Sequence, residues 1–198
     1  MKLYYAATSP YVRKVMACAI TRGLEGRIQL HPSNPHASPA DLVADNPTSK
    51  VPCLITDDGL SLYDSPVICE FLDSLGDAPP LFPVSSAPRW RALKLQAMGD
   101  GILDAAVPCR GELQRPKEAA RDAAIARYKA AMFRTVDALE ADPPHRHIDI
   151  GSLAVACALG YLDFRYPSDP WRPGHPKLTA WFEEFAKNPG IAQTAPKE

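Results

Sequence analysis

Hydrophobic positions near the start of the chain change from strand-like to helix-like spacing. A short apolar run at residues 3–6 is followed by a stripe from Val12 to Ile20, whose members recur every three or four positions. That spacing places them on one face of a helix. A second short run at residues 28–30 comes next. The pattern predicts two strands joined by a helix, a β-α-β unit.

The next hydrophobic runs predict a hairpin followed by another helix. Asp57-Asp58-Gly59 separates two short apolar runs, which is a strong turn signal, and a helical stripe from Ile68 to Leu75 follows. Both predicted helices begin at a Ser-Pro pair, at residues 9–10 and 65–66. Serine suits the position before a helix because its oxygen accepts a backbone hydrogen bond, and proline suits the first turn.

Strand-like spacing ends before residue 88. Residues 77–88 are rich in proline and predict a linker, and the spacing beyond it predicts only helices. One of them, Leu153–Leu162, is apolar on every face, which is typical of a helix at the centre of a bundle. We therefore expect an α+β fold. Residues 1–76 form a four-stranded mixed sheet with helices, and residues 89–198 form an all-helical domain.

Composition and charge argue against a nucleic-acid partner and against a membrane partner. The chain has 198 residues and a formal net charge of -1, so no strong field indicates nucleic acid or an anionic membrane. Its longest apolar run is about half the length needed to span a bilayer, and the apolar start is too short for a secretory signal. We expect a cytoplasmic protein with no nucleic-acid or membrane partner.

The five cysteines are scattered, odd in number and never arranged as C-x-x-C. That distribution argues against a disulfide scaffold and against a zinc site, and it fits a reducing compartment. We expect no metal cofactor.

Ser9 lies in the segment Thr8-Ser9-Pro10-Tyr11-Val12, between the first strand and the first helix. Free N–H groups and the helix dipole favour an anion there. Thioredoxin-like folds carry C-P-Y-C at this place. Ser9 and Val12 replace the two cysteines, which excludes dithiol chemistry, but a hydroxyl can still donate a hydrogen bond to a thiolate. The alternative is that Ser9 only caps the helix.

Two further motifs have both a structural and a binding interpretation. In Lys50-Val51-Pro52 the proline opens a strand and cannot donate to the ladder. In thioredoxin-like folds a cis proline holds the preceding backbone ready for peptide-like pairing; an ordinary edge-strand proline is the alternative. Asp64 and Ser65 open the second helix, where they suit an ammonium and a carboxylate, although both residues are also common caps.

Together these motifs resemble the glutathione transferase superfamily. The segment from Asn46 to Leu54 is similar to its NP-x-x-KVP-x-L motif, and the segment from Asp64 to Ile68 is similar to [ED]-S-x-x-I. The segment from Ser9 to Val15 resembles the SPF-x-x-[RK]V site of serine-type members. The likeness is strongest to small bacterial glutathione transferase-like proteins. It implies a thioredoxin-like N-terminal domain followed by a helical bundle, and a homodimer.

The resemblance also implies a function and the residues that carry it. Ser9 would be catalytic, holding the glutathione sulfur as a thiolate that attacks a small hydrophobic electrophile. Val51 would bind the cysteinyl backbone, Asp64 and Ser65 the γ-glutamyl end, and Lys50 the glycyl carboxylate. Glutathione is then a co-substrate. His36 is a further candidate for the glycyl carboxylate. Asp104, Arg110 and Glu112 are polar positions that would face the second substrate, with a solvated helix face as the alternative. Tyr11 and Trp171 would line an apolar pocket, with core packing as the alternative.

Two other functions remain open from the sequence. Some superfamily members keep the architecture and act as non-catalytic regulatory proteins through partner contacts. A glutathione-dependent thiol oxidoreductase is the third option. Ser9 in place of cysteine weighs against it, and Cys53, beside Pro52, is interpreted as structural.

Overall fold

The computed structural model describes residues 1–196, and contacts within the chain divide it into two compact units. The first unit combines Met1–Ser85 with the segment that begins at Asn188. The second is Ser86–Lys187.

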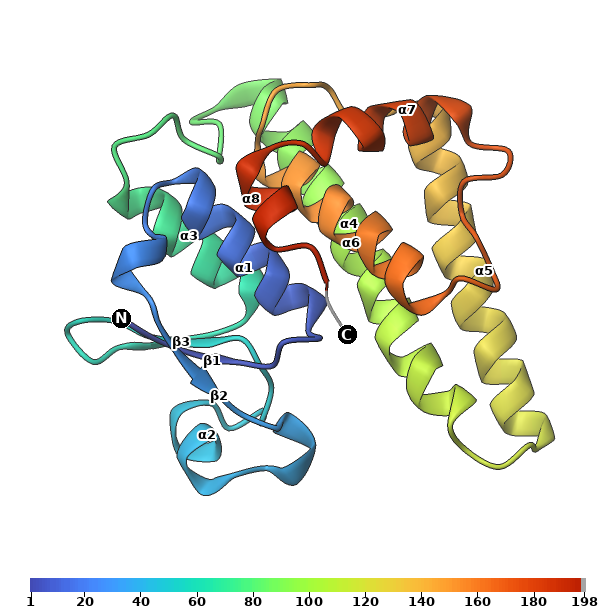
Figure 1. The fold of residues 1–198 in the computed structure, drawn as a ribbon, viewed down its shortest axis with the longest axis horizontal. Coiled ribbons are helices and arrows are strands. Elements are labelled where there is room, and N and C mark those ends of the chain that lie inside the picture. Colours follow the sequence, from blue (N-terminus) through green and yellow to red (C-terminus); the bar gives the residue numbers. More distant parts are fainter. Residues whose placement is uncertain (197–198) are drawn as a thin grey trace. The chain divides into compact units, whose positions relative to one another are not determined.

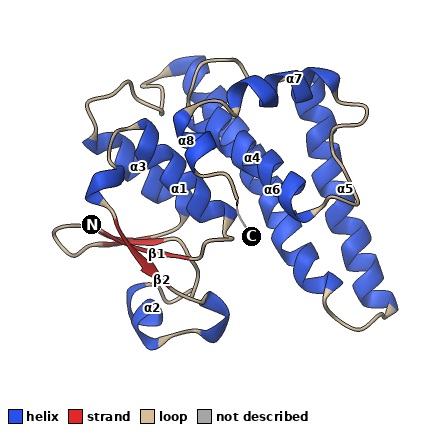
Figure 2. Cartoon of the chain, viewed as in Figure 1, coloured by secondary structure: helices blue, strands red, loops and turns tan. Residues whose placement is uncertain are grey.

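The first unit contains a mixed sheet in the order β2-β1-β3-β4, drawn in red in Figure 2. Leu3 of β1 lies opposite Leu30 in the parallel pair with β2 and opposite Leu54 in the antiparallel pair with β3. The strands are β1 (Lys2–Tyr5), β2 (Gln29–Pro32), β3 (Cys53–Ile55) and β4 (Ser61–Leu62). The predicted fold class, a four-stranded mixed sheet followed by a helical domain, is confirmed.

Helices cover both faces of this sheet. Figure 1 shows α1 and α3 side by side on one face and α2 on the other. Gly23 follows the C-cap of α1 at φ +69°, a conformation that glycine adopts without strain, and the helix ends there. The helical elements are α1 (Pro10–Thr21), η1 (Glu25–Arg27), η2 (Pro35–Ala37), α2 (Ala40–Asp45), α3 (Ser65–Leu75) and α8 (Pro189–Gln193).

Two tertiary contacts attach distant segments to α1. Gly190 of α8 packs so closely that an added Cβ would lie 2.6 Å from the Ala17 carbonyl oxygen. Arg22, at the end of α1, forms a buried ion pair with Asp73 of α3 at 3.0 Å. The Asp73 carboxylate also accepts the N–H groups of Leu81 and Phe82, at 2.8 and 3.0 Å. These contacts explain why residues 77–85 and α8 belong to the first unit.

The second unit is a helical bundle built around α6. All thirteen residues from Ile150 to Leu162 are buried, as the run of apolar residues predicted, and α6 packs along α4. Its start is a capping box in which the Asp149 carboxylate accepts the Ser152 N–H at 2.8 Å, while the Ser152 hydroxyl accepts the Asp149 N–H at 2.9 Å. The helices are α4 (Ser86–Leu113), α5 (Ala119–Ala141), α6 (Ile150–Arg165) and α7 (Pro176–Phe185).

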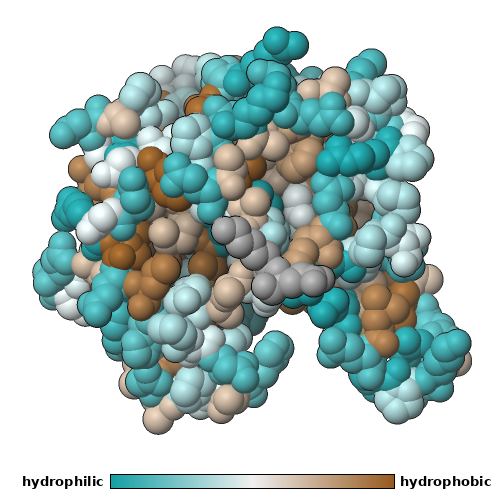
Figure 3. Space-filling model, viewed as in Figure 1, coloured by the Kyte–Doolittle hydropathy of each residue, from teal (hydrophilic) through white to brown (hydrophobic). Residues whose placement is uncertain are grey.

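The surface in Figure 3 is mostly hydrophilic, and hydrophobic side chains gather in a few places. One lies toward the end of α4 and the start of α5. Leu113, the last residue of α4, is 45% exposed. Within residues 1–196, helices of the length and apolar composition needed to cross a bilayer are absent.

Candidate active site at the end of the sheet

The strand register brings the three predicted motifs to one end of the sheet. Ser9 follows the C-terminal end of β1, and Val51 precedes β3, whose first residue lies opposite Tyr4 of β1. In the β3–β4 pair Leu62 lies opposite Leu54, so continuing the register sets Asp64 beside the start of β3. Segments that are as much as 56 positions apart in the sequence therefore meet where β1 ends.

Ser9 is the N-cap of α1 and is half-buried. Its Oγ accepts the Val12 N–H at 3.3 Å, so the predicted cap is present. A serine hydroxyl has one donor proton and two acceptor lone pairs, so capping leaves the proton available for another acceptor. The first turn of α1 holds no acidic residue, and the helix dipole therefore presents an uncompensated positive end beside this hydroxyl.

Val51 and Pro52 are joined by a cis peptide bond. The Val51 side chain is buried in a cluster with Tyr4, Val12 and Cys53, which sets its backbone next to the start of α1. Within residues 1–196, the N–H and C=O of Val51 take part in no hydrogen bond. An extended segment of a ligand can therefore pair with this backbone as an added strand would.

Asp64 and Ser65 form the start of α3. Asp64 is the exposed N-cap and its carboxylate makes no capping hydrogen bond, whereas Ser65 is buried as the first helical residue. The N–H groups of Ser65 and Val67 lie in the first turn, where a helix offers them no acceptor. An acidic group and free backbone donors thus lie side by side, which suits a ligand that carries an ammonium and a carboxylate on one carbon.

Comparisons with known proteins identify the family of the chain. Residues 8–75 match the family described as glutathione S-transferase, N-terminal domain, and residues 122–184 match glutathione S-transferase, C-terminal domain. The uncharacterized GST-like protein YibF of Escherichia coli (strain K12) is 30% identical over 201 residues, covering 99% of this chain and 98% of YibF. The chain belongs to the glutathione S-transferase family.

Solved structures of similar proteins contain the family's ligand. A glutathione transferase family member from Pseudomonas fluorescens Pf-5, solved with bound glutathione, is 40% identical with a TM-score of 0.94; the match covers 100% of this chain and 99% of that one. A glutathione S-transferase from Methylobacillus flagellatus KT, also with glutathione bound, is 30% identical with a TM-score of 0.86 over 99% of both chains.

Asn46 supports the loop before Val51, a role that the sequence analysis did not assign to it. It is 1% exposed, its Nδ2 donates to the Lys50 carbonyl at 2.9 Å, and its Oδ1 accepts the Thr48 N–H at 3.0 Å. These bonds fix the loop that leads into Val51. The Asn-Pro turn signal at residues 46–47 was the available clue, since asparagine often bonds its own turn. The Lys50 side chain is exposed.

Trp171 and Glu112, two of the positions expected near a second substrate, have other partners, and His36, a candidate for the glycyl carboxylate, lies on the surface. Trp171 is 1% exposed, packs edge-on against Phe182, and donates its indole N–H to Asp163 at 2.8 Å. It therefore belongs to the core of the second unit, which was one of the two readings of the sequence. Glu112 pairs with Arg115 at 3.1 Å on the helix surface. His36 is exposed, and its backbone N–H donates to Asn34 Oδ1 at 3.1 Å.

Proposed function

We propose that this protein is a glutathione transferase that activates the thiol of glutathione through Ser9 and transfers the thiolate to a small hydrophobic electrophile. The observation that carries the proposal is the Ser9 hydroxyl at the N-terminus of α1, at the same end of the sheet as the Val51 backbone and the Asp64-Ser65 pair. The glutathione bound in similar structures supports the choice of ligand.

Each part of glutathione then has a partner of matching chemistry. The cysteinyl backbone pairs with the N–H and C=O of Val51. The γ-glutamyl ammonium contacts Asp64, and its carboxylate accepts hydrogen bonds from Ser65 and the first turn of α3. Lys50 contacts the glycyl carboxylate. This leaves the sulfur at the start of α1, where the Ser9 proton and the helix dipole both favour its negative form. The homodimer and the cytoplasmic location stay predictions.

Glutathione is expected to stabilise the folded protein. A ligand at about 100 times its Kd adds about 2.7 kcal/mol to the free energy of unfolding, which for a chain of this size raises Tm by about 5–10 °C. The double variant Asp64→Ala, Ser65→Ala is expected to lose most of that shift, because it removes the partners of the γ-glutamyl end. Differential scanning fluorimetry with and without glutathione measures both.

A control for the Asp64→Ala, Ser65→Ala variant replaces an aspartate and a serine elsewhere in the first unit. Asp77 and Ser85 are both exposed, and the variant Asp77→Ala, Ser85→Ala should keep the full shift. A wild-type protein that gains no stability at millimolar glutathione contradicts the proposal and favours a non-catalytic regulatory protein. Equal shifts in both double variants would contradict the assignment of Asp64 and Ser65.

Cys53 tests the thiol oxidoreductase alternative. Burial, and then the nearby Asp45 carboxylate, raise the pKa of the Cys53 thiol to about 11. At pH 8 about one molecule in a thousand then carries the thiolate, which is the reactive form. All five cysteines are buried.

We therefore expect native protein at pH 8 to react with a thiol-specific chromogenic disulfide far more slowly than the same protein in guanidinium chloride. The unfolded sample should release the signal of five thiols. Rapid modification of Cys53 in the native state, identified by peptide mass spectrometry and absent from Cys53→Ser, would support redox chemistry instead.

A further inference from the structure

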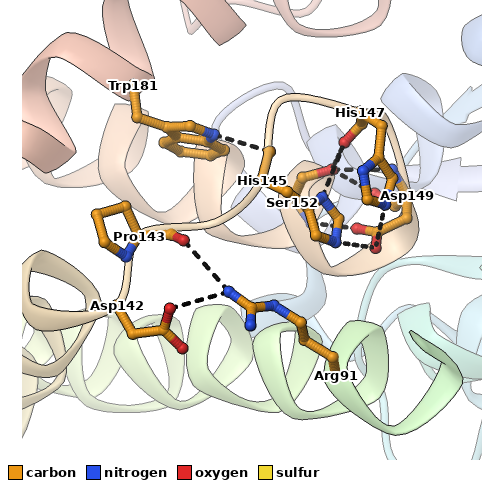
Figure 4. A network of polar contacts seen from close by, with 8 residues as sticks. All are labelled: Arg91, Asp142, Pro143, His145, His147, Asp149, Ser152 and Trp181. Atoms are coloured by element: carbon orange, nitrogen blue, oxygen red, sulfur yellow. Dashed lines mark hydrogen bonds and ion pairs between the residues drawn. The ribbon is translucent and has the colours of Figure 1, made fainter. Parts of the chain in front are cut away.

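The loop between α5 and α6 brings two histidines and a carboxylate together, as Figure 4 shows. One ligand atom from each of His145, His147 and Asp149 lies within 4.8 Å of the others. The Nε2 atoms of His145 and His147 are 3.2 and 3.9 Å from Asp149 Oδ2. We propose that these three side chains form a binding site for a divalent transition metal, with Zn²⁺ as the reference ion.

The carboxylate oxygen that faces the histidines is buried and accepts no hydrogen bond. Asp149 is 2% exposed; its Oδ1 accepts the Ser152 N–H of the capping box, but Oδ2 has no hydrogen-bond donor. Buried polar atoms in proteins are almost always paired, and the only partners that the described residues offer this oxygen are the two imidazole nitrogens, either as protonated rings or through a shared cation. The capping box explains one oxygen of Asp149 and leaves the other for a ligand.

The tautomer of His145 is compatible with a metal as that partner. His145 Nδ1 lies 3.3 Å from the His147 carbonyl oxygen, which can only accept, so this bond requires the proton on Nδ1. In the neutral ring Nε2 then carries a lone pair, 3.2 Å from a lone pair of Asp149 Oδ2. Two lone pairs repel at this distance, so the contact requires either a second ring proton, which makes His145 a cation, or a metal ion between the two atoms. A backbone carbonyl on the other ring nitrogen is also the usual support of a metal-binding histidine.

The loop that carries the histidines is held in place from several sides (Figure 4). Trp181 donates its indole N–H to the His145 carbonyl at 3.1 Å. Arg91 of α4 donates to Asp142 Oδ1 at 3.0 Å, where the loop begins. A ligand set fixed in this way needs little further ordering when the ion binds.

The donor set suits Zn²⁺ and neighbouring ions of the first transition row. Imidazole nitrogen and carboxylate oxygen are their usual ligands, and a tetrahedral zinc with bonds of about 2.0–2.1 Å needs ligand atoms about 3.3 Å apart. The rings of His145 and His147 stack with centroids 3.2 Å apart, so coordination in the plane of both rings requires one to rotate. The His147 side chain is 65% exposed and free to do so, and water can fill the fourth position.

Metal titration of chelator-treated full-length protein, without glutathione, tests this site independently of the proposed function. Calorimetry with ZnCl₂ should give one ion per chain with a Kd in the micromolar range or below, and Co²⁺ should give the visible bands of a tetrahedral complex. At a free Zn²⁺ concentration about 100 times Kd, Tm should rise by about 5–10 °C.

Two variants remove ligands while keeping the fold. His147→Ala changes an exposed side chain, and Asp149→Asn keeps an oxygen to accept the Ser152 N–H while replacing the charged Oδ2. Each should weaken Zn²⁺ binding at least about 10-fold. Two control variants should bind Zn²⁺ as tightly as the wild type does. Arg146→Ala changes the residue between the two histidines. His31→Ala removes a histidine that pairs with a carboxylate, Asp41, in the first unit. The proposal is overturned if the wild-type protein does not bind Zn²⁺, or if His147→Ala binds Zn²⁺ with the same affinity as the wild type.

Discussion

Replacing Ser9 by alanine is expected to lower kcat/KM for glutathione conjugation about 10- to 150-fold at pH 7. A thiol with a pKa near 9 needs about 2.7 kcal/mol of preference for its charged form to ionise two pH units lower. A hydrogen bond to a charged group contributes about 1.5–3 kcal/mol, and the dipole of α1 contributes about 0.3–1 kcal/mol. Loss of the hydroxyl removes the hydrogen bond, which is the larger of these two contributions. Each 1.36 kcal/mol corresponds to a factor of ten in rate. Turnover of a chromogenic aryl halide by the wild type and by Ser9→Ala measures the change in kcat/KM.

The pH dependence of the Ser9→Ala defect separates this role from a structural one. Glutathione bound to the variant should ionise with a higher pKa than on the wild type, so the defect is largest below that pKa. It should shrink as the pH rises toward 9, where the thiol ionises without help. Thiolate absorbance in the ultraviolet, titrated on both proteins, reports the pKa of the bound thiol directly.

Two control variants account for the capping role of Ser9. The Ser9 Oγ accepts the Val12 N–H, so alanine also costs about 1 kcal/mol of stability. Ser9→Thr keeps both the cap and a hydroxyl and should retain most of the activity. Thr8→Ala changes an exposed neighbour and should leave activity at the wild-type level. If Ser9→Ala turns over as fast as the wild type, or its thiol titrates with the same pKa, Ser9 has no catalytic role.

Replacing Gly99 by alanine is expected to lower the free energy of unfolding by about 1–3 kcal/mol or more, because it forces α4 away from α6. A Cβ at Gly99 would lie 2.6 Å from the Ala154 carbonyl carbon and 2.9 Å from the Val155 nitrogen. Both are backbone atoms of the buried helix, so they cannot move aside as a flexible side chain would. Urea denaturation followed by circular dichroism gives the change.

Gly101 is the matched control for this prediction. It lies two residues further along α4, and an added Cβ there meets no atom within 4 Å. Alanine is the better helix former by about 1 kcal/mol, so Gly101→Ala should leave stability unchanged or raise it by up to that amount. If Gly99→Ala proves as stable as Gly101→Ala, α4 and α6 do not pack as closely as described here.

Local signals in the sequence predicted much of the fold. The Ser-Pro pairs mark the starts of α1 and α3 because proline suits the first turn of both helices, and in α1 the serine oxygen also caps; in α3 Ser65 is already the first helical residue and Asp64 precedes it. Asp57-Asp58-Gly59 marks the hairpin because Gly59, at φ +88°, takes a conformation that other residues avoid. The apolar run in α6 indicates a central helix because only a fully buried helix needs no polar face.

The residues of the candidate site were also proposed from the sequence, but by family motif. Capping serines and strand-opening prolines are common, and nothing local relates Ser9 to Val51 or to Asp64. The register of β1, β3 and β4 sets those residues at one end of the sheet, and strand pairing depends on the whole core. The role of Asn46 became visible only when its partner, the Lys50 carbonyl, was identified.

The sequence by itself thus determined which segments form the main helices and strands, which faces are apolar and which residues offer useful chemistry, since these depend on neighbours along the chain; it did not fix every boundary, since α4 begins at Ser86, inside the predicted linker. The tertiary structure decided which distant groups meet. The packing of Gly190 on Ala17 places α8 against α1, and the fold of the loop before α6 turns His145 and His147 toward Asp149. Such contacts leave no local signal, because each results from packing and loop closure over many residues at once.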